Sequence, residues 1–431
     1  MAEQKATVAV IGAGKMGLPL ACAIAGNGAT VTACDSSPRV VDAINGGKAQ
    51  LDEPGVADVV AALVRERRLR ATVDTAAAVA QSQVVIVIVP VLLTSAREAD
   101  TSIIESVSAQ IAEGMRAGTM VSYETTLPIG GTRRLLPILE RGGLKAGEGF
   151  DLVFSPERVK SRLVLQGLAR TPKVVGGFTP AAAERAARFY SEYLGAPVIN
   201  VGTLEAAEMV KLAGMIYRDA NIALANELAG YCEEVGLDVL DVIRAANTDG
   251  EANLLQPGIG VGGHCTPVYP YFAIHDARRR QAPLRLVEAG RQINEEQPAH
   301  AVARLERALG SLRGARALIL GLAFRPLVKE HTCSPAFALR DALRSRGAEP
   351  LLHDPLYTPE EVRAAGFGPG SPDDAPLPEA LVLNTAHPAY AQLDFRDMAG
   401  RGLKAVLDGR ALWQPEAVRS AGLIYVGVGR P

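Results

Sequence analysis

Short apolar runs alternate with longer Ala-rich segments of helical period over the first 200 residues. Thr7–Ile11 and Ala29–Cys34 are apolar runs, and Val84–Val89 is an unbroken run of Val and Ile, which is typical of strands buried on both faces. Later apolar runs follow at Met120–Tyr123, Leu152–Phe154 and Val174–Val175. Strands that alternate with helices predict a doubly wound α/β domain with a parallel sheet, which we place at residues 1–202.

The pattern changes to long helical segments after residue 203. Leu204–Val235 is dominated by Ala, Leu and Glu and is long enough for a helix of eight or nine turns. A second helical stretch runs over Pro283–Leu309, and a Gly-rich segment, Asn247–Pro270, lies between the two. We therefore expect a central helical domain over residues 203–310.

The last third of the chain returns to the α/β pattern. Ala315–Leu322 is expected to be a strand and Ser334–Arg346 a helix, and further strands are expected at Pro350–His353, Ala380–Asn384 and Ala405–Leu407. This predicts a second α/β domain over residues 311–431. The expected fold class is α/β, with two Rossmann-like doubly wound domains joined by a long central helix and a helical connector domain.

Composition and charge narrow the class of protein. Hydrophobic residues make up 48% and charged residues 21% of 431 residues, and a net charge of −2 favours neither nucleic acid nor an anionic membrane as a partner. No apolar stretch approaches the roughly 20 residues that a membrane helix needs. The five cysteines are scattered and no pair has CxxC spacing, so we expect neither a disulfide framework nor a metal site. A cytoplasmic protein with reduced thiols is expected.

A phosphate-binding turn follows the first predicted strand. Gly12-Ala13-Gly14-Lys15-Met16-Gly17 matches GxGxxG between a strand and a helix. In such a turn Gly12 permits the tight bend, Gly14 lets the backbone approach a pyrophosphate, and Gly17 lets the helix pack on the strand. The helix N-terminus then faces the negative charge. These residues, Lys15 and Met16 included, are the expected dinucleotide site.

An acidic residue ends the second predicted strand. Asp35 lies where a carboxylate accepts hydrogen bonds from the adenosine ribose and repels a 2′-phosphate, so NAD is the expected cofactor rather than NADP. Arg39 is a further cofactor-binding candidate that would weaken this preference, unless it lies on the following helix. The second α/β domain has no such motif. Leu320–Arg325 ends a strand without GxGxxG, which leaves open another phosphate-bearing ligand or a structural repeat.

The strongest candidate for covalent chemistry is Cys265. It follows Gly258, Gly260, Gly262 and Gly263 in the run Gly-Ile-Gly-Val-Gly-Gly-His-Cys-Thr-Pro. A loop so rich in Gly is neither a helix nor a strand, and it either lets the backbone pass close to a ligand or aims a side chain. Backbone N–H groups or the nearby His264 imidazole would stabilise a thiolate at Cys265. The cysteines at positions 22, 34 and 232 are instead expected to be small buried residues.

NAD and a reactive thiol together indicate a four-electron oxidation. One hydride transfer turns an alcohol into an aldehyde, the thiolate adds to it, a second hydride transfer gives a thioester, and water releases an acid. Such a sequence also needs a group that stabilises oxyanions and one that moves protons.

From these motifs the chain resembles the UDP-glucose/GDP-mannose dehydrogenase family nearly end to end. Its Gly-Gly-His-Cys run is most similar to the branch that oxidises N-acetylated UDP-hexosamines. The resemblance implies a homodimer through the central helix and a nucleotide-sugar substrate. It also implies roles for Thr126 in Glu124–Pro128, for Glu157 in Ser155–Val159, and for Lys211 in Glu208–Leu212.

The implied roles divide between catalysis, cofactor and substrate. Thr126 is expected near the nicotinamide and the catalytic water, Glu157 is the expected acid/base, and Lys211 is expected to stabilise oxyanionic intermediates. Val89 and Pro90, at the end of a strand, are expected beside the cofactor. The remaining residues expected at the substrate are Arg158, Gly262, Arg325 and Arg410.

Three positions depart from the family's pattern. Met215 replaces an Asn four residues after Lys211, Tyr269 replaces an Asp four residues after Cys265, and Glu251 takes the place of an Arg before the Gly-rich run. Losing one oxyanion donor costs about 10²–10³ in rate in comparable enzymes. We therefore keep three alternatives: a divergent homologue that stops at the aldehyde, a protein that only binds a nucleotide sugar, and a two-electron β-hydroxyacid dehydrogenase.

Overall fold

The computed structural model describes residues 5–51, 53–159 and 164–431. The chain forms two compact units, which we describe separately. The first unit contains the residues up to Ala213 together with Tyr271–Asp276, and the second contains Gly214–Pro270 and Ala277–Pro431. The division into three domains at residues 202 and 310 stays a prediction. Among the described residues, no helix is both long enough and apolar enough to cross a membrane.

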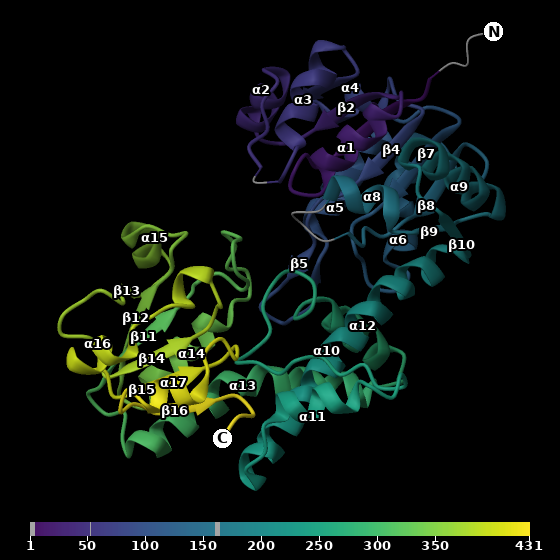
Figure 1. The fold of residues 1–431 in the computed structure, drawn as a ribbon. Coiled ribbons are helices and arrows are strands. Elements are labelled where there is room, and N and C mark those ends of the chain that lie inside the picture. Colours follow the sequence, from purple (N-terminus) through teal and green to yellow (C-terminus); the bar gives the residue numbers. More distant parts are fainter. Residues whose placement is uncertain (1–4, 52, 160–163) are drawn as a thin grey trace. The chain divides into compact units, whose positions relative to one another are not determined.

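The first unit is built on an eight-stranded sheet with the strand order β10-β9-β8-β7-β4-β1-β2-β3 (Figure 1). Its strands are β1 (Thr7–Ile11), β2 (Thr30–Cys34), β3 (Leu69–Thr72), β4 (Val84–Val87), β7 (Thr119–Tyr123), β8 (Phe150–Phe154), β9 (Lys173–Gly177) and β10 (Val198–Thr203). A separate hairpin pairs β5 (Leu92–Leu93) with β6 (Ala99–Asp100). The order reverses between β1 and β4, where open α/β sheets bind ligands at the carboxyl ends of their strands.

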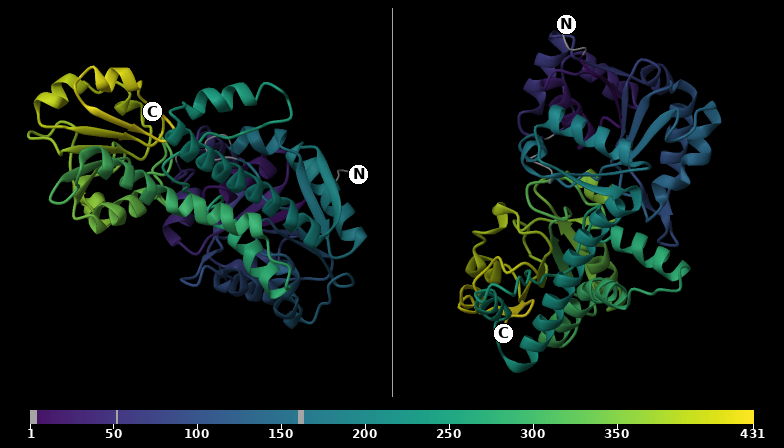
Figure 2. Two further views of the ribbon diagram at one scale, coloured as in Figure 1. Left: turned by 90° about the horizontal axis from the view of Figure 1, so that it is seen from below. Right: turned by 90° about the vertical axis from the view of Figure 1, so that its right-hand side faces the viewer.

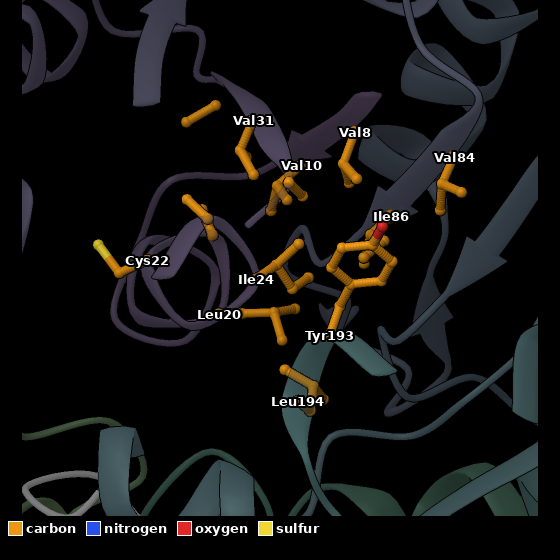
Figure 3. Close-up of a cluster of buried hydrophobic side chains, with 14 of the residues drawn as sticks. Val8, Val10, Leu20, Cys22, Ile24, Val31, Val84, Ile86, Tyr193 and Leu194 are labelled. Atoms are coloured by element: carbon orange, nitrogen blue, oxygen red, sulfur yellow. The ribbon is translucent and has the colours of Figure 1, made fainter. Parts of the chain in front are cut away.

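Helices cover this sheet because the strands present apolar side chains to both faces. The helices are α1 (Gly17–Gly26), α2 (Pro38–Asn45), α3 (Val56–Arg65), α4 (Thr75–Val79), α5 (Ser102–Gly114), α6 (Gly131–Arg134), α7 (Leu136–Leu139), α8 (Val164–Arg170) and α9 (Pro180–Leu194), with a 3-10 turn η1 (Glu140–Gly142). Figure 3 shows the core between α1 and the sheet, where Leu20 and Ile24 lie near Val10 and Ile86. This confirms the predicted α/β architecture.

One part of the expected sheet is different. Strands β8, β7, β4, β1, β2 and β3 are parallel to their neighbours, as predicted, but β9 runs antiparallel to β8, and β10 runs parallel to β9. The predicted fold class holds, but the sequence did not predict this antiparallel pair. When two neighbouring strands are antiparallel, the second begins at the edge of the sheet where the first ends. When they are parallel, the chain must first cross back to the opposite edge. The amino end of β9 therefore lies at the edge where β7 and β8 have their carboxyl ends.

Helix α10 (Leu204–Val235) has the predicted bounds and continues from the first unit into the second. In the second unit it packs along α13 (Arg285–Leu309), as the two long helices in Figure 2 show. Buried polar groups join the two helices: Arg291 Nη1 lies 2.6 Å from Asp219 Oδ1, and Asn226 Nδ2 donates to Asn294 Oδ1 at 2.9 Å. The segment between them contains two further helices, α11 (Val239–Ala246) and α12 (Tyr269–Arg279).

The C-terminal part of the second unit is a parallel six-stranded sheet with the order β13-β12-β11-β14-β15-β16. Its elements are β11 (Arg316–Leu320), α14 (Pro335–Ser345), β12 (Glu349–His353), α15 (Pro359–Ala364), β13 (Gly368–Pro369), β14 (Ala380–Leu383), a 3-10 turn η2 (Pro388–Tyr390), α16 (Phe395–Gly400), β15 (Ala405–Asp408), α17 (Pro415–Arg419) and β16 (Ile424–Gly427).

The alternation of side chains along β11 explains why this sheet is covered on both faces. Ala317 and Ile319 belong to one buried cluster, which includes Leu305 of α13 and Leu339 of α14. The intervening residues Leu318 and Leu320 belong to another, which includes Met398 of α16 and Val418 of α17. Successive side chains of a strand point to opposite faces, so one apolar strand supports two cores.

Candidate active site

The predicted phosphate-binding turn joins β1 to α1 in the first unit. Gly12 has a φ of +101°, a left-handed conformation that favours glycine, and its N–H donates to Cys34 O at 2.8 Å. A Cβ at Gly17 would lie 1.8 Å from Gly12 O, so only glycine fits where α1 meets the turn. The turn is therefore held by the strand beside it and by the helix that follows it.

Asp35 lies beside this turn, as expected for the residue that binds the ribose. Its Oδ2 accepts from Ala13 N at 3.1 Å and its Oδ1 accepts from Ser37 N at 2.9 Å. A carboxylate has about four lone-pair positions, so both oxygens can still accept a hydrogen bond from a ribose hydroxyl. Arg39 lies on α2 and is exposed, which is the alternative placement that the sequence left open.

The turn is open to its surroundings at Gly14. A Cβ added at Gly14 would meet no protein atom within 4 Å, in contrast to Gly17. Gly14 and Lys15 are exposed, Met16 is half-buried, and the turn lies at the N-terminus of α1, a helix of 10 residues. Val89 and Pro90 follow β4 across the switch point. These residues fit NAD, whose pyrophosphate would meet backbone N–H groups at the helix N-terminus.

Two predicted catalytic residues of the first unit follow the carboxyl ends of β7 and β8, and a third contacts the segment after β8. Thr126 is buried in the segment after β7, and Glu157 follows β8. Glu157 N donates to Glu124 O at 3.3 Å, which brings the two segments together. Lys211 of α10 is also buried, and its Nζ donates to the Glu157 carbonyl oxygen. Thus an acid/base candidate and a cationic candidate from distant parts of the chain are in contact.

Sequence reasoning did not assign roles to two buried charged groups beside them. Lys173, the first residue of β9, has its Nζ 2.5 Å from Glu124 Oε2 and 3.7 Å from Glu157 Oε2. Burial raises the pKa of Glu124, and Lys173 opposes that shift. The only available signal was a Lys inside an otherwise apolar strand (Lys-Val-Val-Gly-Gly), because a buried Lys usually has an ionic partner. Arg158, a predicted substrate residue, donates from Nη2 to Pro172 O just before β9.

The predicted cysteine loop lies in the second unit and is shaped by its glycines. Gly260 has a φ of +150° and Gly263 a φ of +100°. A Cβ at Gly262 would lie 2.5 Å from Phe324 Cβ, and one at Gly263 would lie 3.0 Å from Phe324 Cε2. The backbone thus passes close to the protein's own Phe324 side chain. Cys265 is half-buried, and its carbonyl oxygen accepts from Val268 N and Tyr269 N as α12 begins.

Side chains from two elements of the second unit hold this loop. Asn226 Oδ1, on α10, accepts from Gly258 N at 2.9 Å. Arg410, after β15, donates to Gly260 O at 3.1 Å and to Asn384 O at 2.7 Å. Burial lowers the pKa of Arg410 to about 10, so it still carries its charge at neutral pH. His264 forms an ion pair with Glu330 when it is protonated. The expected role of Arg410 at the substrate stays a prediction.

A turn in the second unit has the same geometry as the turn after β1, but the acidic side chain beside it is buried. Gly321, after β11, has a φ of +102°, and its N–H donates to His353 O at 2.7 Å. Asp354 Oδ2 accepts from Leu322 N at 2.7 Å and Ala323 N at 2.9 Å, and His387 Nε2 lies 3.3 Å from the same oxygen. Asp354 is 3% exposed. This turn is therefore a structural repeat of the turn from Gly12 to Gly17, and Arg325 lies half-buried in the segment that follows Gly321.

The three residues that depart from the family's pattern and the three buried cysteines lie in different surroundings. Met215 is half-buried one turn after Lys211 on α10, Tyr269 begins α12, and Glu251 is exposed. Cys22, Cys34 and Cys232 are buried as predicted, and burial raises the pKa of the first two to about 12. Within the described ranges, no group of three or more His, Cys, Asp or Glu side chains is placed to hold a metal ion.

Comparison with known proteins identifies the family. Residues 6–194 match the NAD binding domain of the UDP-glucose/GDP-mannose dehydrogenase family, residues 205–296 its central domain and residues 318–415 its UDP binding domain. The UDP-N-acetyl-D-mannosamine dehydrogenase of Pyrococcus horikoshii is 31% identical over 430 residues, which cover 98% of this chain and 99% of that protein.

Solved structures show the same likeness. A UDP-D-ManNAc dehydrogenase from Pyrococcus horikoshii has a TM-score of 0.90 at 30% identity and covers 98% of this chain and 99% of its own. A UDP-glucose dehydrogenase from Pyrobaculum islandicum has a TM-score of 0.89 at 26% identity and covers 100% of this chain and 99% of its own. The chain therefore belongs to the UDP-glucose/GDP-mannose dehydrogenase family, and its cofactor is NAD.

Proposed function

We propose that this protein oxidises the C6 hydroxyl of a nucleotide sugar, of the UDP-N-acetylhexosamine type, to the carboxylic acid through covalent intermediates on Cys265. The observation that carries this proposal is the contact between Lys211 and Glu157, in the same unit as the turn that fits NAD. Relatives named as UDP-N-acetyl-D-mannosamine dehydrogenases support the class of substrate. A UDP-glucose-type sugar is the other substrate that this site would take.

Each predicted catalytic residue has a defined task in this reaction. When bound, NAD+ accepts a hydride in each of the two oxidations, so one sugar consumes two molecules. Glu157 takes the proton of the C6 hydroxyl, directly or through a water that Thr126 positions. Lys211 Nζ holds the negative oxygen as it forms. The thiolate of Cys265 bonds to the aldehyde carbon, and the thioester made by the second oxidation is broken by water, which returns the thiol and releases the acid.

The ratio of NADH to sugar tests this proposal. Purified protein with NAD+ and a panel of nucleotide sugars is expected to release two NADH per sugar consumed, with an acid as the product by mass. Cys265→Ala is expected to abolish the second NADH and the acid product, whereas Cys333→Ala, which removes an exposed thiol, should keep both.

The same measurement separates the alternatives. One NADH per sugar and an aldehyde product would show that the enzyme stops halfway. Met215 and Tyr269 make this the main alternative, because they stand where the family's pattern has an Asn and an Asp. Full activity of Cys265→Ala on a β-hydroxyacid would indicate a two-electron dehydrogenase. Binding of a UDP-sugar without any NADH would indicate a binding protein.

We further propose that the protein forms a homodimer through α10. Tyr217, Leu224 and Tyr231 recur at intervals of seven residues and are 54%, 46% and 68% exposed, which gives one apolar stripe along the helix. Large apolar side chains gathered on one exposed face are typical of association surfaces. A second copy of α10 presents the same stripe, so it is the occupant that the surface fits.

A further inference from the structure

The carboxyl edge of the first unit's sheet holds a lysine between two carboxylates. Lys173 Nζ lies 2.5 Å from Glu124 Oε2 and 3.7 Å from Glu157 Oε2, and the Lys173 and Glu124 side chains are 6% and 0% exposed. Glu157 is the acid/base of the proposed function, on which the following inference rests. We propose that Lys173 is a positioning residue that keeps the Glu157 carboxylate ionised and oriented, and that Glu124 holds Lys173 in place.

The topology explains why this lysine reaches the site. Glu124 and Glu157 follow the carboxyl ends of the parallel strands β7 and β8. A parallel β9 would place its first residue at the opposite edge of the sheet, but β9 is antiparallel to β8. Lys173 therefore begins β9 at the carboxyl edge, next to both acids.

Other groups complete the surroundings of the two carboxylates. Tyr190 of α9 donates its hydroxyl to Glu124 Oε1 at 2.7 Å, and its ring lies 4.9 Å from Lys173 Nζ. Ser122 Oγ lies 2.8 Å from the Tyr190 hydroxyl oxygen. The pKa of Tyr190 is well above its ordinary value because the phenol is buried, so it remains a donor to Glu124. Lys211 of α10 contacts the Glu157 carbonyl oxygen rather than its carboxylate.

The contacts of Glu157 divide between its two oxygens. Oε1 accepts from Val159 N at 2.5 Å, within the segment that follows β8. Oε2 faces Lys173. A backbone donor on one oxygen and a cation near the other favour a single orientation of an ionised carboxylate. Without Lys173, the buried carboxylate of Glu124 would oppose ionisation of Glu157.

The pH dependence of kcat/KM for the nucleotide sugar tests this inference. Replacing Lys173 by Met removes the cation, so the two carboxyls retain a proton to higher pH. We expect the acidic limb of the profile to move up by about one pH unit or more. At pH 7 we expect kcat to fall at least tenfold, with KM for the sugar within threefold. Lys173→Arg keeps the cation and should restore most of the activity and the position of the limb.

Glu124→Gln is the matched variant of opposite sign. It removes the competing negative charge but keeps the shape of the side chain, so the limb should move to lower pH. An acidic limb that is unchanged or raised in Glu124→Gln, or unchanged in Lys173→Met, would overturn the inference. Where Lys173→Met does not fold, Lys173→Gln, which also removes the cation, takes its place, and an unchanged acidic limb in it would overturn the inference.

A measurement without substrate separates this inference from the proposed function. In protein labelled with carbon-13 at the Glu side chains, the Glu157 signal can be assigned by comparison with Glu157→Gln. This carboxyl should take up its proton at higher pH in Lys173→Met than in the wild type. That comparison holds even if no nucleotide sugar is oxidised. The same titration pH in both proteins would contradict the role of Lys173.

Discussion

At the scale of single residues, two glycines of the NAD turn are expected to respond differently to the same substitution. A Cβ at Gly14 would meet no protein atom within 4 Å, whereas a Cβ at Gly17 would lie 1.8 Å from Gly12 O. Gly14→Ala should therefore leave the unfolding temperature unchanged and weaken NAD binding about tenfold, or about 1.4 kcal/mol. Gly17→Ala should lower both the unfolding temperature and the affinity for NAD, and overpacking should cost about 1–3 kcal/mol of the free energy of unfolding. Calorimetric titration with NAD and thermal unfolding measure the two effects.

Gly26→Ala serves as the control, because Gly26 ends the same helix and its Cβ would have no atom within 4 Å. It should keep the affinity for NAD and leave stability unchanged or slightly higher. Unchanged NAD affinity in Gly14→Ala would show that the open space beside Gly14 does not belong to the cofactor.

Which site residues the sequence could predict depends on how far apart their partners lie. The turn from Gly12 to Gly17 and the acid Asp35 follow from short spacings, and Ala13 N does meet Asp35. Lys173 meets Glu124, 49 residues earlier, only because of the antiparallel β9. No spacing in the chain reports the direction of a strand. The contacts of the cysteine loop with Arg410 depend in the same way on a pairing of distant segments.

At the scale of elements, a buried acid links α10 to the short helix α6. Glu208 accepts from Gly130 N at 2.5 Å, Thr132 N at 2.8 Å and Thr132 Oγ1 at 2.7 Å, and it is 0% exposed. Burial raises its pKa from 4.5 to about 7, although these donors oppose the shift. The folded chain thus binds this proton more tightly than the unfolded chain. The resulting stability is complete below pH 4.5 and is lost as the pH rises through about 7.

Glu208→Gln removes this titration and isolates its effect. The wild type should lose about 3 kcal/mol of stability relative to Glu208→Gln between pH 4.5 and pH 8, in proportion to the difference in pKa. Denaturant unfolding of both proteins at several pH values gives the difference, and any constant effect of the amide cancels. A difference that stays constant across this range would show that Glu208 is ionised throughout.

The elements themselves were predictable where the pattern is long or strongly apolar. Leu204–Val235 has the bounds that its composition indicates, because 32 residues outweigh the two glycines inside it. Helices α11 and α12 lie beside or within the Gly-rich region and were not predicted. Helix α12 includes Pro270, which is tolerated in the first turn of a helix because its missing N–H has no partner there. Strand β10 has no fully buried residue, and Asn200 and Gly202 interrupt its apolar positions, so it was not predicted.

At the scale of the whole molecule, each unit contains a βαβ turn with the same bond pattern. Gly12 donates to the end of β2 and Gly321 to the end of β12, and an acid after each strand accepts from the turn. The two acids differ in access, because Asp35 is half-buried whereas Asp354 is buried and lies near His387. The same backbone arrangement therefore leaves an accessible acid beside the first turn and a closed one beside the second. Only the first of these two turns has the GxGxxG spacing.

The exposed apolar stripe on α10 makes the proposed dimer directly testable. A dimer through α10 should have twice the mass of the 45.3 kDa chain by sedimentation. In a two-fold interface each substitution occurs twice, and charges would replace buried apolar area worth about 1.5–3 kcal/mol per side chain. Leu224→Glu combined with Tyr231→Glu should therefore weaken association at least 100-fold and give monomers. Val73→Glu, at an exposed apolar residue of the first unit, should remain dimeric. A doubly charged α10 that still sediments as a dimer would place the interface elsewhere.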